Sequence, residues 1–378
     1  MKMSLKSRKE LVTKAKGRYL KATKPEKVLI LDELSQNTGL ARNYLIQIMS
    51  AKVDLDYVNP INRKRRVSYD ANVVHYLKKI WTIFDYPCGQ RLEPMLPEYV
   101  SVLERFKEVI IPNLVKEKVL KIKSATIDRR LEKFRTFRHK KTFSTTKPGS
   151  LLKKNIPIKT SSWDETRLGY GELDTVAHCG NSAAGEFIFT LTYTDIASQW
   201  TISEAVMGKG QKGIKLALEN IAKRLPFPLK GIDPDNGSEF INWQLYTHCL
   251  ANNIEFTRGR PYAKNDNAHI EQKNYTHVRK LMGYGRMDKE WQLNKMNDLY
   301  WSEQDFYKNF FLSNKKLIEK KRVGTKIVKK YDIPRTPFQR LLENKEFAES
   351  EKEKLKMIYA KLNPAELKRS LDRKISKI

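Results

Sequence analysis

The 378-residue chain lacks the features of several large protein classes. It has only three cysteines, Cys88, Cys179 and Cys249, and no CxxC pair, so neither a disulfide framework nor a cysteine-based zinc finger is expected. The six histidines are scattered. No stretch approaches the ~18 consecutive apolar residues of a membrane-spanning helix, and the Lys-rich N-terminus lacks the apolar run of a signal peptide. We therefore expect a cytoplasmic protein that makes no membrane contact.

Acidic residues are also scarce: 43 Asp and Glu stand against 73 Lys and Arg, a net charge of +30. Residues 1–150 carry a net +18, residues 151–290 only +2, and residues 291–378 a net +10. Basic flanks that hold a polyanion around a carboxylate-bearing centre would produce this distribution. The composition favours nucleic acid as the partner and a nucleoid-associated location. The alternative is a generally basic protein with solvated lysine faces.

Residues 1–60 have the pattern of a helix-turn-helix DNA-binding domain. Thr23–Glu26 has the form of a capping box, Gly39 ends that helix, and Thr38 could cap the next one, near residues 40–52. We expect the apolar side of the second helix to carry Leu40, Tyr44, Leu45 and Ile48. Its polar residues, which suit contacts with base edges or phosphates, are Arg42, Asn43 and Gln47. A plain helical hairpin is the alternative.

Residues 61–138 predict a second helical DNA-binding unit. Its first helix is expected to bury the stripe Val74, Leu77, Trp81 and Phe84. Residues 124–131 resemble a capped helix that presents Arg129 and Arg130, which makes it a candidate recognition helix. The basic run at 63–66 suits phosphate contacts or an ordinary charged linker. Residues 139–161 are rich in turn formers and predict a linker.

Residues 162–290 change to a mixed α/β pattern. Strands are expected near 168–176, 186–194, 200–207, 229–233 and 254–257, with helices near 212–225, 241–251 and 267–282. This order predicts a mixed five-stranded sheet, in which an antiparallel meander leads into parallel crossovers. Residues 291–378 form a basic C-terminal region. They predict a small β module near 321–331 and helices over 343–362 and 364–375.

Three acids occupy positions where backbone geometry can bring them together. Asp174 lies inside an apolar strand, Asp235 follows a strand end, and Glu271 begins a helix. Converging carboxylates repel one another unless cations neutralise them, and hard oxygen ligands suit Mg²⁺ or Mn²⁺, with two ions expected. Each acid also has an ordinary explanation, as an edge residue, a turn residue or a helix-start charge. Asp233 competes with Asp235, and Asp266 competes weakly with Glu271.

The motifs around these acids resemble those of bacterial insertion-sequence transposases with a retroviral-integrase-like core. They are Leu173-Asp174-Thr175, the run DNGSEF at 235–240 and the run NDNAHIEQKN at 265–274. Between Asp235 and Glu271 lie 35 residues, the D,D-35-E spacing of these DDE enzymes. The resemblance covers about a third of the chain strongly. It implies an RNase H-like catalytic core at residues 162–290, with Asp174, Asp235 and Glu271 as catalytic and metal-binding residues.

The resemblance also implies an activity and partners. Water would attack the phosphodiester at a transposon end, and the freed 3′-OH would then attack target DNA in the same site. The partner would be double-stranded DNA, bound by a homo-oligomer, with Lys264, Lys273 and Arg279 as contact candidates. The chain departs from the family in two respects. It lacks the zinc-binding N-terminal domain of retroviral integrases, and Val278 stands where many members have Lys or Arg, although Arg279 and Lys280 follow.

Three other functions compete with this interpretation. A domesticated transposase could act as a catalytically silent DNA-binding regulator, but the presence of all three acids argues against it. An RNase H-like nuclease would cut without joining, whereas large basic flanks favour ordered recognition of DNA ends. A structural nucleoid protein fits the nearly neutral centre poorly. Fold analogy alone does not decide among them.

Overall fold

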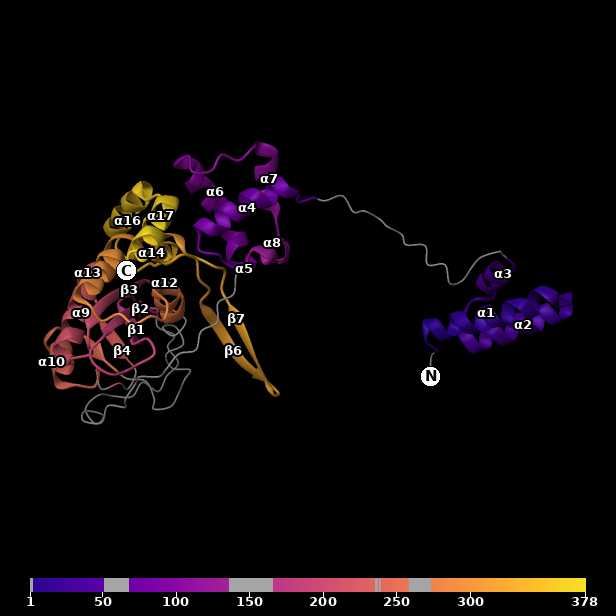
Figure 1. Cartoon of the computed structure of the whole chain (residues 1–378), viewed down its shortest axis with the longest axis horizontal. Coiled ribbons are helices and arrows are strands. Elements are labelled where there is room, and N and C mark those ends of the chain that lie inside the picture. Colours follow the sequence, from indigo (N-terminus) through magenta and orange to yellow (C-terminus); the bar gives the residue numbers. More distant parts are fainter. Residues whose placement is uncertain (1–2, 51–67, 136–165, 235–236, 238, 258–272) are drawn as a thin grey trace. The chain divides into compact units, whose positions relative to one another are not determined.

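The computed structural model describes residues 3–50, 68–135, 166–234, 237, 239–257 and 273–378 (Figure 1). The chain divides into two compact units, Met1–Val67 and Ser68–Ile378. No helix among these residues is long and apolar enough to cross a membrane. The basic run at 63–66 and the expected linker at 139–161 lie outside the described residues.

Three helices form the first unit: α1 (Leu5–Lys21), α2 (Lys24–Thr38) and α3 (Arg42–Ser50). The predicted limits of α2 are confirmed, because the Thr23 backbone N–H donates to Glu26 Oε2 at 2.7 Å and Gly39 ends the helix with a φ of 67°. Thr38 does not cap α3. Its hydroxyl instead donates to the Leu34 carbonyl of its own helix at 2.5 Å. Helix α1 was not expected.

The three helices enclose a small apolar core. The expectation that Tyr44 faces this core is wrong, since its side chain is 52% exposed and Met49 is buried instead. A helical N-terminal region is thus confirmed, whereas its use as a helix-turn-helix stays a prediction. The buried side chains of this core are Val12, Ala15, Tyr19, Ile30, Leu31, Leu34, Leu45, Ile48 and Met49.

The second unit contains the predicted mixed five-stranded sheet. Its strands are β1 (Tyr170–Ala177), β2 (Ile188–Asp195), β3 (Thr201–Met207), β4 (Gly231–Pro234) and β5 (Glu255–Phe256). They lie in the order β3-β2-β1-β4-β5, so β1 is the central strand. The β1–β2 and β2–β3 pairs are antiparallel, and the β1–β4 and β4–β5 pairs are parallel. This arrangement confirms the predicted antiparallel meander that leads into parallel crossovers.

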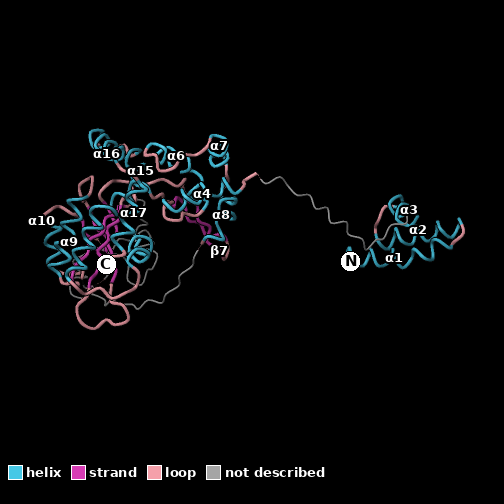
Figure 2. The backbone as a smooth tube through the Cα atoms, turned by 45° about the horizontal axis from the view of Figure 1, so that its top comes forward, coloured by secondary structure: helices cyan, strands magenta, loops and turns pink. Residues whose placement is uncertain are grey.

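Helices enclose the sheet, as Figure 2 shows. Helix α9 (Gln211–Arg224) packs on β3 and β2, and α10 (Trp243–Ala251) packs on α9 and β5. The π-helix η3 (Asn274–Arg279) contacts β1 and continues into α12 (Lys280–Met282). Three further elements, which were not expected, pack along β3: α13 (Glu290–Leu299), η4 (Tyr300–Gln304) and α14 (Asp305–Phe311).

The predicted second helical region is present and shares one hydrophobic core with the sheet and the C-terminal helices. The Tyr99 hydroxyl donates to the Phe311 carbonyl at 2.7 Å, and the Tyr99 ring stacks on Phe84. The predicted stripe needs one correction, because Val73 rather than Val74 is fully buried. The elements are α4 (Ala71–Ile83), α5 (Gly89–Leu92), η1 (Glu93–Met95), α6 (Leu96–Arg105), α7 (Asn113–Lys121), α8 (Ser124–Leu131) and η2 (Glu132–Phe134).

The small C-terminal β module is confirmed as an antiparallel hairpin of β6 (Leu317–Val323) and β7 (Lys326–Tyr331). Figure 1 shows this hairpin extending away from the helices, and every residue of β7 is exposed. The helix expected over 343–362 is shorter, because α16 begins only at Glu349, and the helix expected over 364–375 has those limits. The C-terminal helices are α15 (Pro337–Glu343), α16 (Glu349–Lys361) and α17 (Pro364–Ile375).

Candidate active site

Asp174 lies in the middle of β1, the central strand, and its side chain is half-buried. Its backbone partner on β2 is Thr192. One carboxylate oxygen, Oδ1, accepts the Thr175 backbone N–H at 2.7 Å. A carboxylate in the centre of a sheet is costly unless polar groups surround it. The position therefore requires partners for the Asp174 carboxylate.

Asn274 is the partner that comes from farthest along the chain. Its Nδ2 donates to Asp174 Oδ2 at 2.6 Å across 100 residues of sequence. Asn274 is 8% exposed and begins the π-helix η3. Its Oδ1 is buried and accepts no hydrogen bond from the described residues. Isolated π-helical turns occur frequently at functional sites. The contact joins the Leu173-Asp174-Thr175 motif to the last residue of the 265–274 motif.

The other two predicted acids, Asp235 and Glu271, lie outside the described residues. Residues close to both acids in the sequence are described. Pro234, which precedes Asp235, ends β4 and pairs with Leu173, which precedes Asp174. Asn274 follows Glu271 by three residues. Pro234 therefore lies beside the residue that precedes Asp174, and Asn274 contacts Asp174 itself.

Glu239 is a buried acid that sequence reasoning did not single out beyond its place in the DNGSEF motif. Its Oε1 accepts the Thr175 hydroxyl at 3.3 Å, and its Oε2 lies 3.6 Å from Lys209 Nζ. Thr175 follows Asp174 on β1, so Glu239 packs beside the strand that carries Asp174. Its place in the DNGSEF motif was the available signal. The competitor Asp233 is buried on β4, where its Oδ1 accepts the Thr257 hydroxyl at 3.0 Å.

Carboxylate and amide oxygens, the ligands that Mg²⁺ and Mn²⁺ prefer, are available here from Asp174, Asn274 and Glu239. The half-buried Asp174 carboxylate and the buried Asn274 Oδ1, which accepts no described hydrogen bond, fit such an ion. Within the described ranges, no group of three or more His, Cys, Asp or Glu side chains is placed to hold a metal. Asp195 is buried elsewhere in the sheet. It accepts the Gly169 N–H at 2.8 Å and the Ser198 N–H at 2.7 Å, so it fixes the local turns.

The predicted DNA-contacting residues fall into three groups. Exposed side chains are found at four positions: Arg42, which pairs with Asp32 at 3.0 Å, Asn43, Gln47 and Arg129. Arg130 and Arg279 are half-buried, and Lys273 is buried rather than on an open helix face. Burial lowers the pKa of Lys273 to about 7. Lys264 lies outside the described residues.

Comparison with known proteins shows a relative over nearly the whole chain. The uncharacterized protein y4rM of Sinorhizobium fredii is 34% identical over 341 residues, which cover 90% of this chain and 96% of that protein. No protein-family model matches the chain. Among solved structures, the catalytic core domain of BIV integrase is similar at 14% identity and a TM-score of 0.30, over 46% of this chain and 93% of that one.

Proposed function

The chain belongs to the same family as the uncharacterized protein y4rM of Sinorhizobium fredii, and we propose that it is a DDE transposase or integrase. It would cleave transposon DNA ends and transfer the strands into target DNA. The proposed catalytic residues are Asp174, Asp235 and Glu271. This function goes beyond the integrase-like arrangement of the sheet, because folds of this kind can host more than one chemistry.

The contact between Asp174 and Asn274 is the observation that carries the proposal. It joins two of the three motifs over 100 residues at 2.6 Å, with one acid on the central strand. Any carboxylate in the centre of a sheet needs polar partners. Here the partner comes from the segment that directly follows Glu271, which supports grouping Asp174 with the third motif, and a catalytic carboxylate must be oriented by such a neighbour. The Leu173–Pro234 pair supports the same grouping from the side of β4.

Asp174, together with Asp235 and Glu271, would hold divalent cations, Mg²⁺ or Mn²⁺. When bound, such ions supply the positive charge that an in-line phosphoryl transfer needs at both the attacking and the leaving oxygen. The protein's own side chains would orient the Asp174 carboxylate. Asn274 fixes one Asp174 oxygen, and the Thr175 N–H fixes the other. The substrate phosphate would approach the end of β4, where Pro234 pairs with Leu173 of β1.

Binding and holding of DNA would fall to the basic parts of the chain. In the first unit, α3 would act as a recognition helix through Arg42, Asn43 and Gln47, and α8 would present Arg129 and Arg130. The β6–β7 hairpin adds a third surface. Its residues 317–331 include six Lys or Arg and one Glu, and a two-stranded ribbon fits the major groove. Two or more protomers would bring the two transposon ends together.

The test is a strand-transfer assay with the full chain, a linear DNA that carries the gene's own flanking ends, a target plasmid and Mg²⁺ or Mn²⁺. Wild-type protein should cleave and join. Asp174→Asn, Asp235→Asn and Glu271→Gln should each lose joining by about 100-fold or more while still binding the DNA. Glu346→Gln, an exposed acid on the far C-terminal segment, is the matched control and should remain active.

The other possible outcomes would indicate other functions. Binding without cleavage under either metal would favour the DNA-binding regulator. Cleavage without joining would favour an RNase H-like nuclease. Full activity in Asp174→Asn would overturn the proposed site, because the central-strand carboxylate would then be dispensable.

A further inference from the structure

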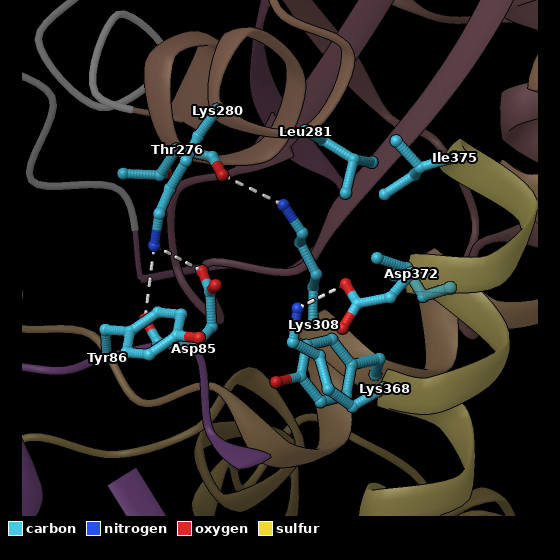
Figure 3. Close-up of a pocket in the computed structure, with 11 residues that line it drawn as sticks. Asp85, Tyr86, Thr276, Lys280, Leu281, Lys308, Lys368, Asp372 and Ile375 are labelled. Atoms are coloured by element: carbon cyan, nitrogen blue, oxygen red, sulfur yellow. Dashed lines mark hydrogen bonds and ion pairs between the residues drawn. The ribbon is translucent and has the colours of Figure 1, made fainter. Parts of the chain in front are cut away.

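A pocket of about 280 Å³ lies where four helical segments meet, apart from the Asp174 site. Figure 3 shows Asp85 and Tyr86 from the turn after α4, Thr276, Lys280 and Leu281 from η3 and α12, Lys308 from α14, and Lys368, Asp372 and Ile375 from α17. Tyr307 and Leu371 complete the lining. The volume is just below the range of pockets for drug-sized ligands. The pocket is therefore suited to a small ligand.

Two of the three pocket lysines already have carboxylate partners. Lys280 Nζ lies 2.8 Å from Asp85 Oδ2, and Lys368 Nζ lies 2.5 Å from Asp372 Oδ1. These pairs neutralise two positive charges with two negative ones. The third lysine, Lys308, gives the pocket one surplus positive charge in its protonated form.

Lys308 differs from the other two in burial and in partner. It is 4% exposed, and its Nζ donates to the Thr276 backbone carbonyl at 3.0 Å. No carboxylate among the described residues forms an ion pair with it. An ammonium has three N–H donors, so one carbonyl leaves two of them without a described acceptor. A buried ammonium without a counter-charge is unfavourable.

We propose that this pocket binds a small oxyanion, such as inorganic phosphate, with the Lys308 ammonium as its central donor. The anion would supply both the missing counter-charge and the missing acceptors. Lys280 and Lys368 would add positive potential from the rim. The Tyr307 hydroxyl would not bind the anion, because it already donates to the Ile83 carbonyl. An anion there would tie α4, η3, α14 and α17 together. This inference does not rest on the proposed strand-transfer activity.

The test is thermal unfolding of the full chain in increasing potassium phosphate, with potassium chloride at equal ionic strength as the reference. A ligand that binds only the folded state raises the Tm in a saturable way. We expect a saturable rise of several degrees beyond chloride for the wild type and no such rise for Lys308→Met. The matched control, Lys361→Met, removes an exposed lysine at the end of α16 and should respond like the wild type.

A second variant keeps the test decisive if Lys308→Met does not fold. Asp372 is exposed on α17, so Asp372→Asn should fold normally and free Lys368 from its carboxylate. It should reach half of its maximal Tm rise at a several-fold lower phosphate concentration than the wild type. A duplex oligonucleotide forms the last arm. Because Lys308 is nearly inaccessible, stabilisation by DNA should be the same with and without Lys308→Met.

Two results would overturn the proposal. One is a wild-type response to phosphate no larger than the response to chloride. The other is an equal phosphate response in the wild type, Lys308→Met and Asp372→Asn, which would assign the effect to surface lysines. Loss of the duplex effect in Lys308→Met would instead identify the bound anion as a DNA phosphate.

Discussion

The two sheets of this protein are built in opposite ways. In the five-stranded sheet, all of β2 is buried and β1 carries the Asp174 carboxylate among polar partners. In the β6–β7 hairpin, all of β7 is exposed, and six cations stand against one acid. A buried carboxylate needs surrounding groups that fix it, whereas exposed cations need a partner from outside. The difference supports the proposal that the first sheet carries the chemistry and the second binds DNA.

The largest expected difference between the two sheets is in stability. Leu191 is 0% exposed on β2, and Val328 is 54% exposed on β7. Leu191→Ala should lower the free energy of unfolding by about 2–5 kcal/mol, because it removes apolar packing and leaves a cavity. Val328→Ala should change it by less than about 0.5 kcal/mol. Chemical denaturation measures both. Comparable losses would mean that the hairpin is packed in solution.

The next largest effect should appear in catalysis and not in stability. Asn274→Ala removes the amide that holds Asp174 Oδ2 and should lower metal-dependent strand transfer by about 10–100-fold. Binding of end DNA should not change, since Asn274 is buried. A rise in the Mg²⁺ or Mn²⁺ concentration needed for half-maximal activity would distinguish an effect on the metal site from a general loss of folding. Thr276→Ala, two residues along the same π-helix, is the control, and an equal loss in both variants would contradict the assigned role.

A smaller effect should come from the hairpin and appear in binding alone. Arg322 and Lys329 lie on one face of the hairpin, because Arg322 pairs with Ile327, two residues before Lys329. The double variant Arg322→Gln, Lys329→Gln should reduce the slope of log affinity against log salt by about 2, roughly one for each side chain that no longer neutralises a phosphate. Fluorescence anisotropy with duplex DNA measures the slope.

The control for the hairpin is Lys345→Gln with Lys361→Gln, two exposed lysines elsewhere in the C-terminal region. If this pair lowers the slope equally, the hairpin has no special part in binding. At saturating DNA, the hairpin variant should retain cleavage, which separates it from Asn274→Ala.

The succession of the five strands along the chain could be predicted because its signals are local. Alternating aromatic and β-branched residues mark β2, and turn residues mark the strand ends. The small hairpin and α17 were predictable for the same reason. The carboxylate on β1 stood out because Asp is rare inside a strand. All of these inferences use residues within about ten positions of one another.

Helix α14 could not be recognised in this way. Amphipathic periodicity identifies a helix with one apolar face, but α14 is buried on nearly every side, including Asp305, Lys308 and Asn309. Lysine and aspartate normally indicate exposure, so they conceal such a helix. The contact between Asn274 and Asp174 was also unpredictable, because its partners are 100 residues apart. Long-range pairs of this kind depend on the whole fold.

The smallest expected effect concerns Lys308, a buried cation that contrasts with the exposed cations of the hairpin. Burial lowers its pKa to about 7, and the nearby Asp85 partly offsets this. In the unfolded chain a lysine keeps its proton up to a pH of about 10.4. Between these values the unfolded state binds more protons, so the contribution of Lys308 to stability rises with pH. Below pH 7 both states are protonated and the full cost of the buried charge remains. The charged and titratable groups around Lys308 include Asp85, Tyr86, Lys273, His277, Lys280, Tyr307, Lys368 and Asp372.

Lys308→Met, in a buffer free of oxyanions, should therefore be more stable than the wild type by about 1 kcal/mol at pH 6, and this advantage should shrink towards pH 9. Thermal unfolding across that range measures it, with Lys361→Met as the exposed counterpart that should show no such trend. An advantage that is constant with pH would mean that Lys308 keeps its proton throughout. Burial would then change the packing of a lysine but not its protonation, and the interior and the hairpin would not differ in how they hold charge.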